Sequence, residues 1–196
     1  MSRSKLVEKL EELRSKQKLI DSAWKKTGNK EFLQFLVEIL PKTLNAERCS
    51  IFILDPVDKN IWVQCGTGLT ERQVTVPRSS SLVGKTISTG QYQLETDMDK
   101  QLGAHDEVAI KTGFVTRNAL CVPVHGVTKD RVTGAIQVLN KMGSHTFTDQ
   151  DRIILEKLAF HLQMNIENIF IKQELVKISE EMKEQIMTLE TKLTDT

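Results

Sequence analysis

The sequence predicts an α+β protein, with a central antiparallel sheet of five or six strands and helices at both ends of the chain. Alternating, β-branched segments are confined to the middle of the sequence, whereas apolar residues at helical spacing fill both ends. This separation of strands from helices is typical of α+β folds, because α/β folds alternate the two.

The size and charge of the chain narrow the classes of function. Its 196 residues allow one domain with extensions, and 39% apolar with 27% charged residues fit a core-bearing domain plus solvated helices. The 27 Lys and Arg nearly balance the 26 Asp and Glu, which disfavours a nucleic-acid binder that neutralises phosphates. No apolar run approaches the roughly 20 residues of a membrane helix, and the charged start lacks a signal-peptide core. We therefore expect a cytoplasmic protein without membrane or nucleic-acid partners.

The first two expected elements are amphipathic helices. Residues 1–28 are expected to form a helix of their own, which ends at the break Thr27-Gly28-Asn29. Its seam keeps heptad spacing and comprises Leu6, Leu10, Leu13, Ile20 and Trp24. The next helix ends near Pro41 to Leu44, and its apolar face comprises Phe32, Phe35, Leu36, Ile39 and Leu40.

Short segments in the middle indicate the strands. The first two, CSIFILD and NIWVQCG, flank the polar turn Pro56 to Lys59 and predict a hairpin. RQVTVP, QYQLET, ALCVPVHGV and TGAIQVLNK follow, with a charged turn at residues 128–131 between the last two. Between the third and fourth segments, Ser79 to Ser81 can cap a short helix, LVGKTIST, which Gly90 ends. We expect an irregular polar connection from Asp97 to Lys111.

The last element is one long helix that continues past the domain. Thr148 can cap its N-terminus, where Asp149 and Asp151 complement the helix dipole. Its expected core-facing stripe comprises Ile153, Ile154, Leu158, Leu162 and Ile166. The apolar pattern then continues, with one stutter in the heptad, through Ile171, Leu175, Ile178, Met182, Ile186, Leu189 and Leu193. We expect a domain at residues 29–173 and a coiled-coil extension at residues 174–196, whose apolar seam needs a partner.

Residue types that carry catalysis or bind metals are scattered. Cys49, Cys65 and Cys121 form no C-x-x-C pair, and each lies in a strand-like segment, where a free Cys behaves as a small buried hydrophobe. The histidines show no zinc-ligand spacing to one another or to a Cys. The sequence also lacks G-x-S-x-G, P-loop and G-x-G-x-x-G motifs. We expect no catalytic residue, no metal and no cofactor.

One segment resembles a known family. The string TGFVTRNALCVP, which starts at Thr112, is similar to that of the GAF domains in cyclic-nucleotide phosphodiesterases and bacterial adenylyl cyclases. Four further segments agree with that family in order and spacing: AERCSIFILD, VPRSSSLVGKTISTGQ, GAIQVLNK and FTDQD. The resemblance covers residues 30–173. It implies a sheet of about six antiparallel strands, with the terminal helices on one face and a ligand pocket under short roof helices on the other.

The resemblance also implies a structural motif. The family's N-K…F-x-x-x-D-E signature is matched by Asn140, Lys141, Phe147 and Asp151, although Arg152 replaces its final Glu. In the family this motif fastens a strand to the last helix, chiefly through a Lys–Asp pair. A Lys141–Asp151 pair at a helix N-terminus is also physically reasonable as a structural salt bridge.

The family's pocket implies a set of ligand-binding candidates in this chain. The hydroxyls of the family's cyclic-nucleotide binders are kept at Ser50, Thr112 and Thr116. The other positions differ: Gly66 and Thr67 stand for a Phe-Asp pair, Ala109 for an acidic residue, Gln137 for a Glu and Val83 for an Ala. A pocket that loses the hydrogen-bond partners of a base loses selectivity for it. We therefore expect weak or no binding of cAMP and cGMP, although an amide at Gln137 can still donate and accept.

At some of these positions, a structural role is an alternative to contact with a ligand. The two threonines could instead cap the strand that follows them. Arg117 would point away from Thr116 if the segment is extended, so a surface ion pair is expected of it rather than a ligand contact.

The favoured function is a regulatory, small-molecule-sensing domain for signal transduction. We expect a homodimer held by the terminal helices, a ligand that is a nucleotide or a related metabolite, and an output-domain protein as partner. The first alternative is a dimerisation or interaction module with a vestigial pocket. The second is a GAF-type free methionine sulfoxide reductase, which is disfavoured because no Cys lies in the roof between Arg78 and Lys111.

Overall fold

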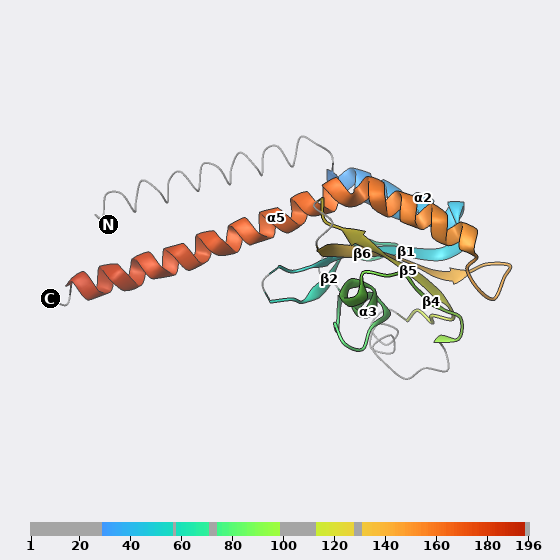
Figure 1. Ribbon diagram of the computed structural model, residues 1–196, viewed down its shortest axis with the longest axis horizontal. Helices are drawn as coiled ribbons and strands as arrows, with labels where there is room; N and C mark the ends of the chain where they lie inside the picture. The colour runs from blue at the N-terminus through green and yellow to red at the C-terminus, as the bar shows by residue number, and fades with distance from the viewer. Residues whose placement is uncertain (1–28, 57, 71–73, 99–112, 128–130, 195–196) are drawn as a thin grey trace. The chain divides into compact units, whose positions relative to one another are not determined.

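The computed structural model describes residues 29–56, 58–70, 74–98, 113–127 and 131–194 (Figure 1). The chain divides into a domain, residues 30–170, and a second unit that includes the last helix from Ile171 onward. The helix expected over residues 1–28 lies outside the described residues, and so does most of the connection expected between Asp97 and Lys111.

The domain is built on one six-stranded antiparallel sheet, as the sequence predicts. Its strands, in chain order, are β1 (Ala46–Leu54), β2 (Ile61–Gly66), β3 (Thr75–Val76), β4 (Gln93–Glu95), β5 (Ala119–His125) and β6 (Val132–Lys141). Their order across the sheet is β3-β2-β1-β6-β5-β4. The hairpin expected from the first two segments is present, since β1 pairs with β2, and β5 pairs with β6 in the same antiparallel way. The two central strands, β1 and β6, therefore come from opposite ends of the domain sequence.

The register of the central strands sets which side chains share a face. Ser50 of β1 lies opposite Gln137 of β6 and opposite Gly66 of β2. Because side chains alternate along a strand, Ser50 shares its face with its second neighbours Arg48 and Phe52. Both central strands thus bring polar groups to one face at the same level of the sheet.

Helices cover both faces of the sheet (Figure 1). Helices α2 (Asn29–Thr43) and α5 (Asp149–Thr194), the latter with its domain part up to residue 170, lie on one face, and α3 (Leu82–Thr89) lies on the other. Fully buried side chains of the two longer helices include Leu33, Val37, Leu40, Leu155, Leu162 and Ile166. The core under α3 includes Phe52, Leu54, Ile61, Val63, Val83 and Ile87. The fold is therefore a three-layer arrangement with two separate cores.

The apolar face of α2 is divided between core and solvent. Leu36 and Leu40 are buried as expected, but Phe32, Phe35 and Ile39 are 43%, 54% and 38% exposed. The apolar face expected from the sequence is therefore only partly turned toward the core. Successive residues turn by about 100° around a helix, so the residues that meet the sheet leave a second apolar stripe facing outward.

The stripe expected on α5 also needs correction. Leu162 and Ile166 are buried as expected, whereas Ile153 is exposed and Ile154 and Leu158 are half-buried. The core positions of the first turns are taken instead by Leu155 and Ala159. The buried residues thus follow the spacing 155, 159, 162, 166, which keeps one face of the helix on the sheet.

Helix α3 has the ends that its sequence predicts. The Ser81 hydroxyl accepts a hydrogen bond of 2.9 Å from the Gly84 amide, and Gly90 ends the helix in the left-handed conformation with φ 66°. Gly84 is required for a different reason, because a Cβ there would lie 2.2 Å from the carbonyl oxygen of Arg78. The segment before α3 is therefore held tightly against the first turn of the helix.

The second unit contains the remaining turns of α5. Ile171, Leu175 and Ile178 are 40%, 40% and 50% exposed. The coiled coil expected at residues 174–196 stays a prediction. In the part of the chain that the structure describes, no helix combines the length and the apolar character needed to cross a membrane.

Candidate functional site

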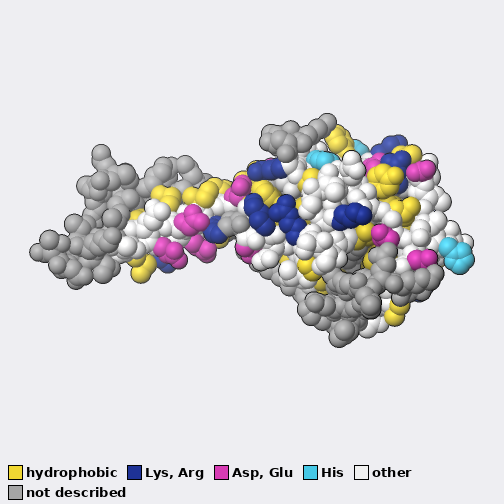
Figure 2. Space-filling view, turned by 60° about the horizontal axis from the view of Figure 1, so that its bottom comes forward, with side chains coloured by type: hydrophobic (Ala, Val, Ile, Leu, Met, Phe, Trp, Pro, Cys, Tyr) yellow, Lys and Arg dark blue, Asp and Glu magenta, His cyan; other side chains and the backbone are white. Residues whose placement is uncertain are grey.

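A cavity of about 240 Å³ lies within the domain, between the sheet and the α3 layer. Its floor comes from β1 and β6, and its roof from α3 and the serines before it. The residues that line it are Arg48, Ser50, Phe52, Leu69, Val74, Val76, Ser79, Ser80, Ser81, Leu82, Val83, Lys85, Glu95, Met98, Phe114, Thr116, Gln137 and Leu139. Figure 2 looks toward this side of the molecule, where Lys and Arg side chains stand among uncharged ones.

Four candidates from the sequence meet at this cavity. Ser50 and Gln137 lie on the floor, Val83 lies in the roof, and Thr116 comes from the segment that leads into β5. Their convergence follows from the register, which places Ser50 directly opposite Gln137. Residues far apart in the sequence are thus brought together around one space.

The polar candidates keep their hydrogen-bonding capacity for the cavity. Ser50 is 4% exposed, and Gln137 and Thr116 are half-buried. Among the described residues, none of these three side chains forms a hydrogen bond with the protein. A buried hydroxyl or amide without a partner is costly. The cavity is therefore suited to a ligand with polar groups of its own.

The remaining candidates from the sequence are not among the described residues that line the cavity. The Thr67 hydroxyl accepts a hydrogen bond of 3.1 Å from the Cys49 amide and lies 3.4 Å from the carbonyl oxygen of Val37 in α2. Thr67 is thus held on the α2 side, away from the cavity. Gly66 borders the floor, because a Cβ at this glycine would come within 2.7 Å of the Ser50 hydroxyl oxygen. Ala109 and Thr112 lie outside the described residues.

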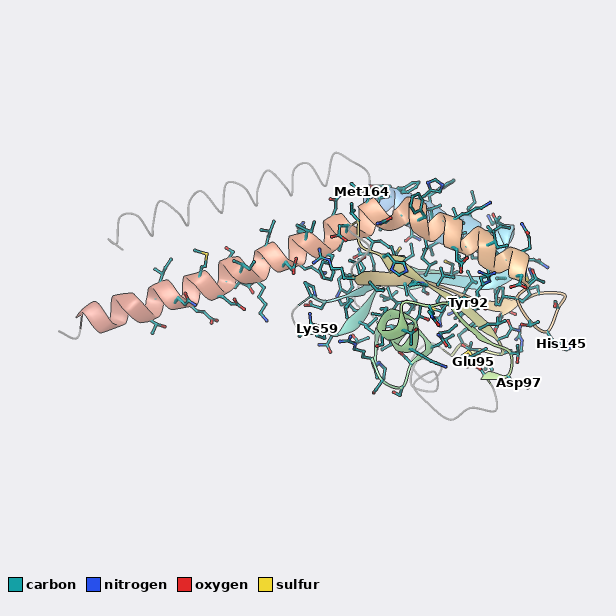
Figure 3. All side chains as sticks on the ribbon, in the orientation of Figure 1. Lys59, Tyr92, Glu95, Asp97, His145 and Met164 are labelled. Atoms are coloured by element: carbon teal, nitrogen blue, oxygen red, sulfur yellow. The ribbon has the colours of Figure 1, made fainter. Side chains whose placement is uncertain are left out.

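Charged side chains that are not among the candidates from the sequence line the cavity as well. The Arg48 guanidinium carbon lies 3.9 Å from the centroid of the Phe114 ring, within the range of a cation–π contact. Lys85 of α3 and Glu95 of β4 also belong to the lining, and Figure 3 shows Glu95 on the α3 side of the sheet. Strand alternation was the available signal for Arg48, because it lies two residues before Ser50 on the same strand.

Asn140, at the end of β6, builds a structural corner beside the cavity. Asn140 is fully buried with φ 57°, and its amide donates to Glu47 Oε2 at 2.9 Å and to the Val115 carbonyl at 2.9 Å. Its side-chain oxygen accepts from the Arg117 amide at 2.7 Å. Arg117 itself pairs with Glu47 through its guanidinium, which is the surface ion pair expected of it from the sequence. This corner fixes the segment that carries Phe114 and Thr116.

Hydrogen bonding at this corner also lowers the pKa of the Glu47 carboxyl. The Asn140 amide holds the pKa of Glu47 below its usual range, against the opposing effect of burial, and Arg117 adds to the lowering. The carboxylate therefore stays ionised and keeps both partners in place at neutral pH.

The three cysteines are buried within the sheet and are not in disulfides. Burial raises the pKa of Cys121 to about 12 and also raises the pKa of Cys49. A thiol held in its protonated form is a poor nucleophile. In the described part of the chain, no three His, Cys, Asp or Glu side chains gather in a way that could hold a metal ion.

Comparison with known proteins places this chain in the family that the sequence resembles. A family model described as the GAF domain matches residues 29–168. The dual 3',5'-cyclic-AMP and -GMP phosphodiesterase 11A of Takifugu rubripes is 26% identical over 125 residues, which cover 58% of this chain. The chain spans only 14% of that relative's length.

Solved structures share the fold at low sequence identity. The GAF domain of a phosphoenolpyruvate-protein phosphotransferase from Coxiella burnetii superposes with a TM-score of 0.61 and 19% identity, covering 84% of this chain and 95% of that one. The free methionine-R-sulfoxide reductase of Neisseria meningitidis, solved with its substrate, gives a TM-score of 0.57 and 16% identity, covering 86% and 93%. At these identities the likeness concerns the fold alone.

Proposed function

The chain belongs to the GAF domain family, and on that basis we propose that it senses a small molecule and acts as a homodimer joined by its terminal helices. GAF domains are typically regulatory or sensory. We further propose that it works in the cytoplasm and that an output-domain protein responds to the state of its helices.

The observation that carries the sensing proposal is the polar floor of the cavity. Ser50, Thr116 and Gln137 converge there without hydrogen bonds to the described protein. A site built to bind polar groups discriminates among ligands through just such unpaired donors and acceptors. A cavity of about 240 Å³, somewhat below the usual range of roughly 300–1,000 Å³ for ligand pockets, fits a small metabolite.

A nucleotide or a related metabolite is the proposed ligand class. The amide of Gln137 can both donate and accept, as recognition of a base requires. The similarity to a cyclic-nucleotide phosphodiesterase is compatible with such a ligand. That enzyme's own activity is not part of the proposal.

The dimer proposal rests on apolar surface that the domain leaves exposed. On α2, Phe32 and Phe35 are 43% and 54% exposed, and on the domain part of α5, Phe160 and Met164 are 63% and 58% exposed. Figure 3 shows Met164 on the helical face, opposite the α3 layer. Exposed apolar groups of this size on neighbouring helices favour association, and a two-fold contact would bury the same surface on both copies.

The reductase alternative is disfavoured by the placement of the thiols. Cys49 and Cys121 are fully buried, with raised pKa values. None of the three cysteines belongs to the cavity lining. The other alternative, an interaction module with a vestigial pocket, differs from the sensor in that it binds no ligand. A ligand-binding experiment therefore distinguishes the two.

A thermal-shift screen of the full chain against a metabolite library tests the sensing proposal. A ligand at about 100 times its dissociation constant should stabilise the fold by about 2.7 kcal/mol. Thr116→Val and Gln137→Leu remove cavity hydrogen bonding and should abolish the shift, whereas Thr43→Val, on the opposite face of the sheet, should keep it. Stabilisation that survives both cavity variants would place the ligand elsewhere and refute the proposal.

Light scattering tests the dimer. A mass of two chains at micromolar concentration is expected for the full protein. Phe35→Glu together with Phe160→Glu should shift the mass toward one chain, because charges replace apolar contacts. Lys42→Glu, at an exposed site on α2, serves as the charge-matched control.

A further inference from the structure

Arg48 has an unusual environment for an arginine in this protein. It lies half-buried in the cavity wall with its guanidinium over the Phe114 ring, and its charge also helps to lower the pKa of the neighbouring Glu47. Every other arginine that the structure describes donates to a side chain: Arg78 to Ser88, Arg117 to Glu47, Arg131 to Glu167 and Arg152 to Asp149. The guanidinium of Arg48 instead lines the cavity without a hydrogen bond or ion pair to the described residues. The nearby Glu47 carboxylate, which the charge of Arg48 affects, is bonded to Arg117 and Asn140.

The contact with Phe114 positions this guanidinium without using its donors. A cation–π contact engages the positive charge with the face of the ring. Arginine carries five N–H donors arranged as a planar fork. With no hydrogen bond drawn from this fork by the described protein, its donors stay available to a ligand.

The balance of charges in the described cavity lining favours an anion. Lys85 of α3 adds a second cation to the lining, and Glu95 contributes one carboxylate that has contacts of its own. The described lining therefore has one more positive than negative group. An anion in this partly desolvated space would interact more strongly with Arg48 than it would in water.

We propose that Arg48 is the anion-binding residue of the cavity, and that the ligand carries a phosphate or carboxylate group bound by its guanidinium fork. Paired N–H groups of Arg match two oxygens of either anion. Phe114 holds the guanidinium, while Ser50 and Gln137 bind the polar remainder of the ligand. This inference rests on the proposed function, because it concerns the ligand of the same cavity.

The test is an NMR titration of the Arg48 Nε–Hε signal in the full chain. The probes are inorganic phosphate, succinate, AMP and adenosine. We expect a saturable shift of the Arg48 signal with at least one of the two small anions. We also expect AMP to bind at least tenfold more tightly than adenosine. A response to phosphate alone identifies a phosphate ligand, and a response to succinate alone identifies a carboxylate.

Variants make the assignment specific. Arg48→Gln should weaken AMP binding at least tenfold. Arg152→Gln removes the same charge from an arginine outside the cavity lining and should leave binding unchanged. Because the titration of the unmodified chain needs no variant, the result does not depend on the stability of Arg48→Gln.

The contradicting outcomes separate this inference from the proposed function. If adenosine shifts the amides of Ser50 and Gln137 and binds as tightly as AMP, the cavity is a ligand site and the role of Arg48 is refuted. If none of the four probes shifts the Arg48 signal, the anion site is refuted, whatever the metabolite screen finds. If AMP binding is equal in Arg48→Gln, the anion is bound elsewhere.

Discussion

The Nζ atom of Lys141 lies 2.9 Å from Oδ1 of Asp151 and joins the end of β6 to the first turn of α5. Both side chains are largely buried, with 13% and 10% of their surface exposed. Lys141 also donates to the Leu44 carbonyl at 2.7 Å, which ties the end of α2 to the same point. Asp151 in turn accepts from the amide and hydroxyl of Thr148, at 2.8 and 3.0 Å. The pair therefore links the central strand β6 to both helices, α2 and α5, that cover one face of the sheet.

The first prediction concerns the stability that this pair provides. Lys141→Ala and Asp151→Ala should each lower the free energy of unfolding by about 3 kcal/mol, because each leaves a buried charge without its partner. The double variant should be less destabilised than the sum of the two, with a coupling energy above about 1 kcal/mol. Urea denaturation of the three variants measures this. Additive effects would show that the two charges do not interact.

The second prediction is a loss of stability in acid. Burial alone would raise the pKa of Asp151, but hydrogen bonds from Thr148 and Lys141 outweigh it and hold the pKa below its usual range. Glu47 is lowered too, chiefly by Asn140. Because the unfolded state then binds more protons, stability is fully present above pH about 4–5 and falls as the pH drops through the folded-state pKa values.

Two variants test the source of this acid effect. Asp151→Asn should be less stable at neutral pH and should show a smaller further loss between about pH 5 and 2, where the aspartates of the unfolded chain titrate. Asp149→Asn changes a carboxylate at the same helix end that is 87% exposed, and it should keep the acid loss of the unmodified protein. An unaltered acid profile in Asp151→Asn would contradict the assignment.

The third prediction concerns the thiols. The native protein should react slowly with a thiol reagent at neutral pH and should not reduce free methionine sulfoxide. The cause is burial, which raises the pKa of Cys121 to about 12 and keeps the thiol protonated. All three cysteines should react fast once the protein is unfolded. Fast native labelling together with reductase activity would favour the enzyme alternative.

The fourth prediction is weak or no binding of cAMP and cGMP. Gly66 and Thr67 stand where the family's cyclic-nucleotide binders have a Phe-Asp pair, and the Thr67 hydroxyl is engaged with Cys49 on the side of α2. The cavity thus lacks a ring and a carboxylate at that position. Calorimetry should find no sub-micromolar dissociation constant for either nucleotide. Tight binding that Gln137→Leu abolishes would overturn the prediction.

The sequence predicts the sheet and the caps well because these depend on local patterns. The strands follow from alternation, and α3 follows from Ser81 and Gly90, whose roles depend on neighbours a few residues away. The pairing of Ser50 with Gln137 was accessible only through the family resemblance, since no local pattern relates the two strands.

Other features depend on packing that no local pattern encodes. Helix α2 carries apolar residues around most of its circumference, so periodicity alone does not decide that Leu33 faces the sheet and Phe35 the solvent. The contact between Arg48 and Phe114 joins β1 to a segment before β5. Asn140 is likewise understood only with Glu47 and Arg117 beside it. Such sites form when distant segments meet across the sheet.

The proposed function predicts that a ligand in the cavity changes the arrangement of the two α5 helices in the homodimer. Spin labels on Glu184→Cys, an exposed position of α5, report the distance between the two copies, because the native cysteines are buried. Helices packed in parallel lie about 8–10 Å apart, so one short inter-label distance is expected, and it should change when a compound from the thermal-shift screen saturates the protein. No dipolar signal at micromolar concentration would contradict the dimer. A distance distribution that is identical with and without bound compound would contradict the sensor.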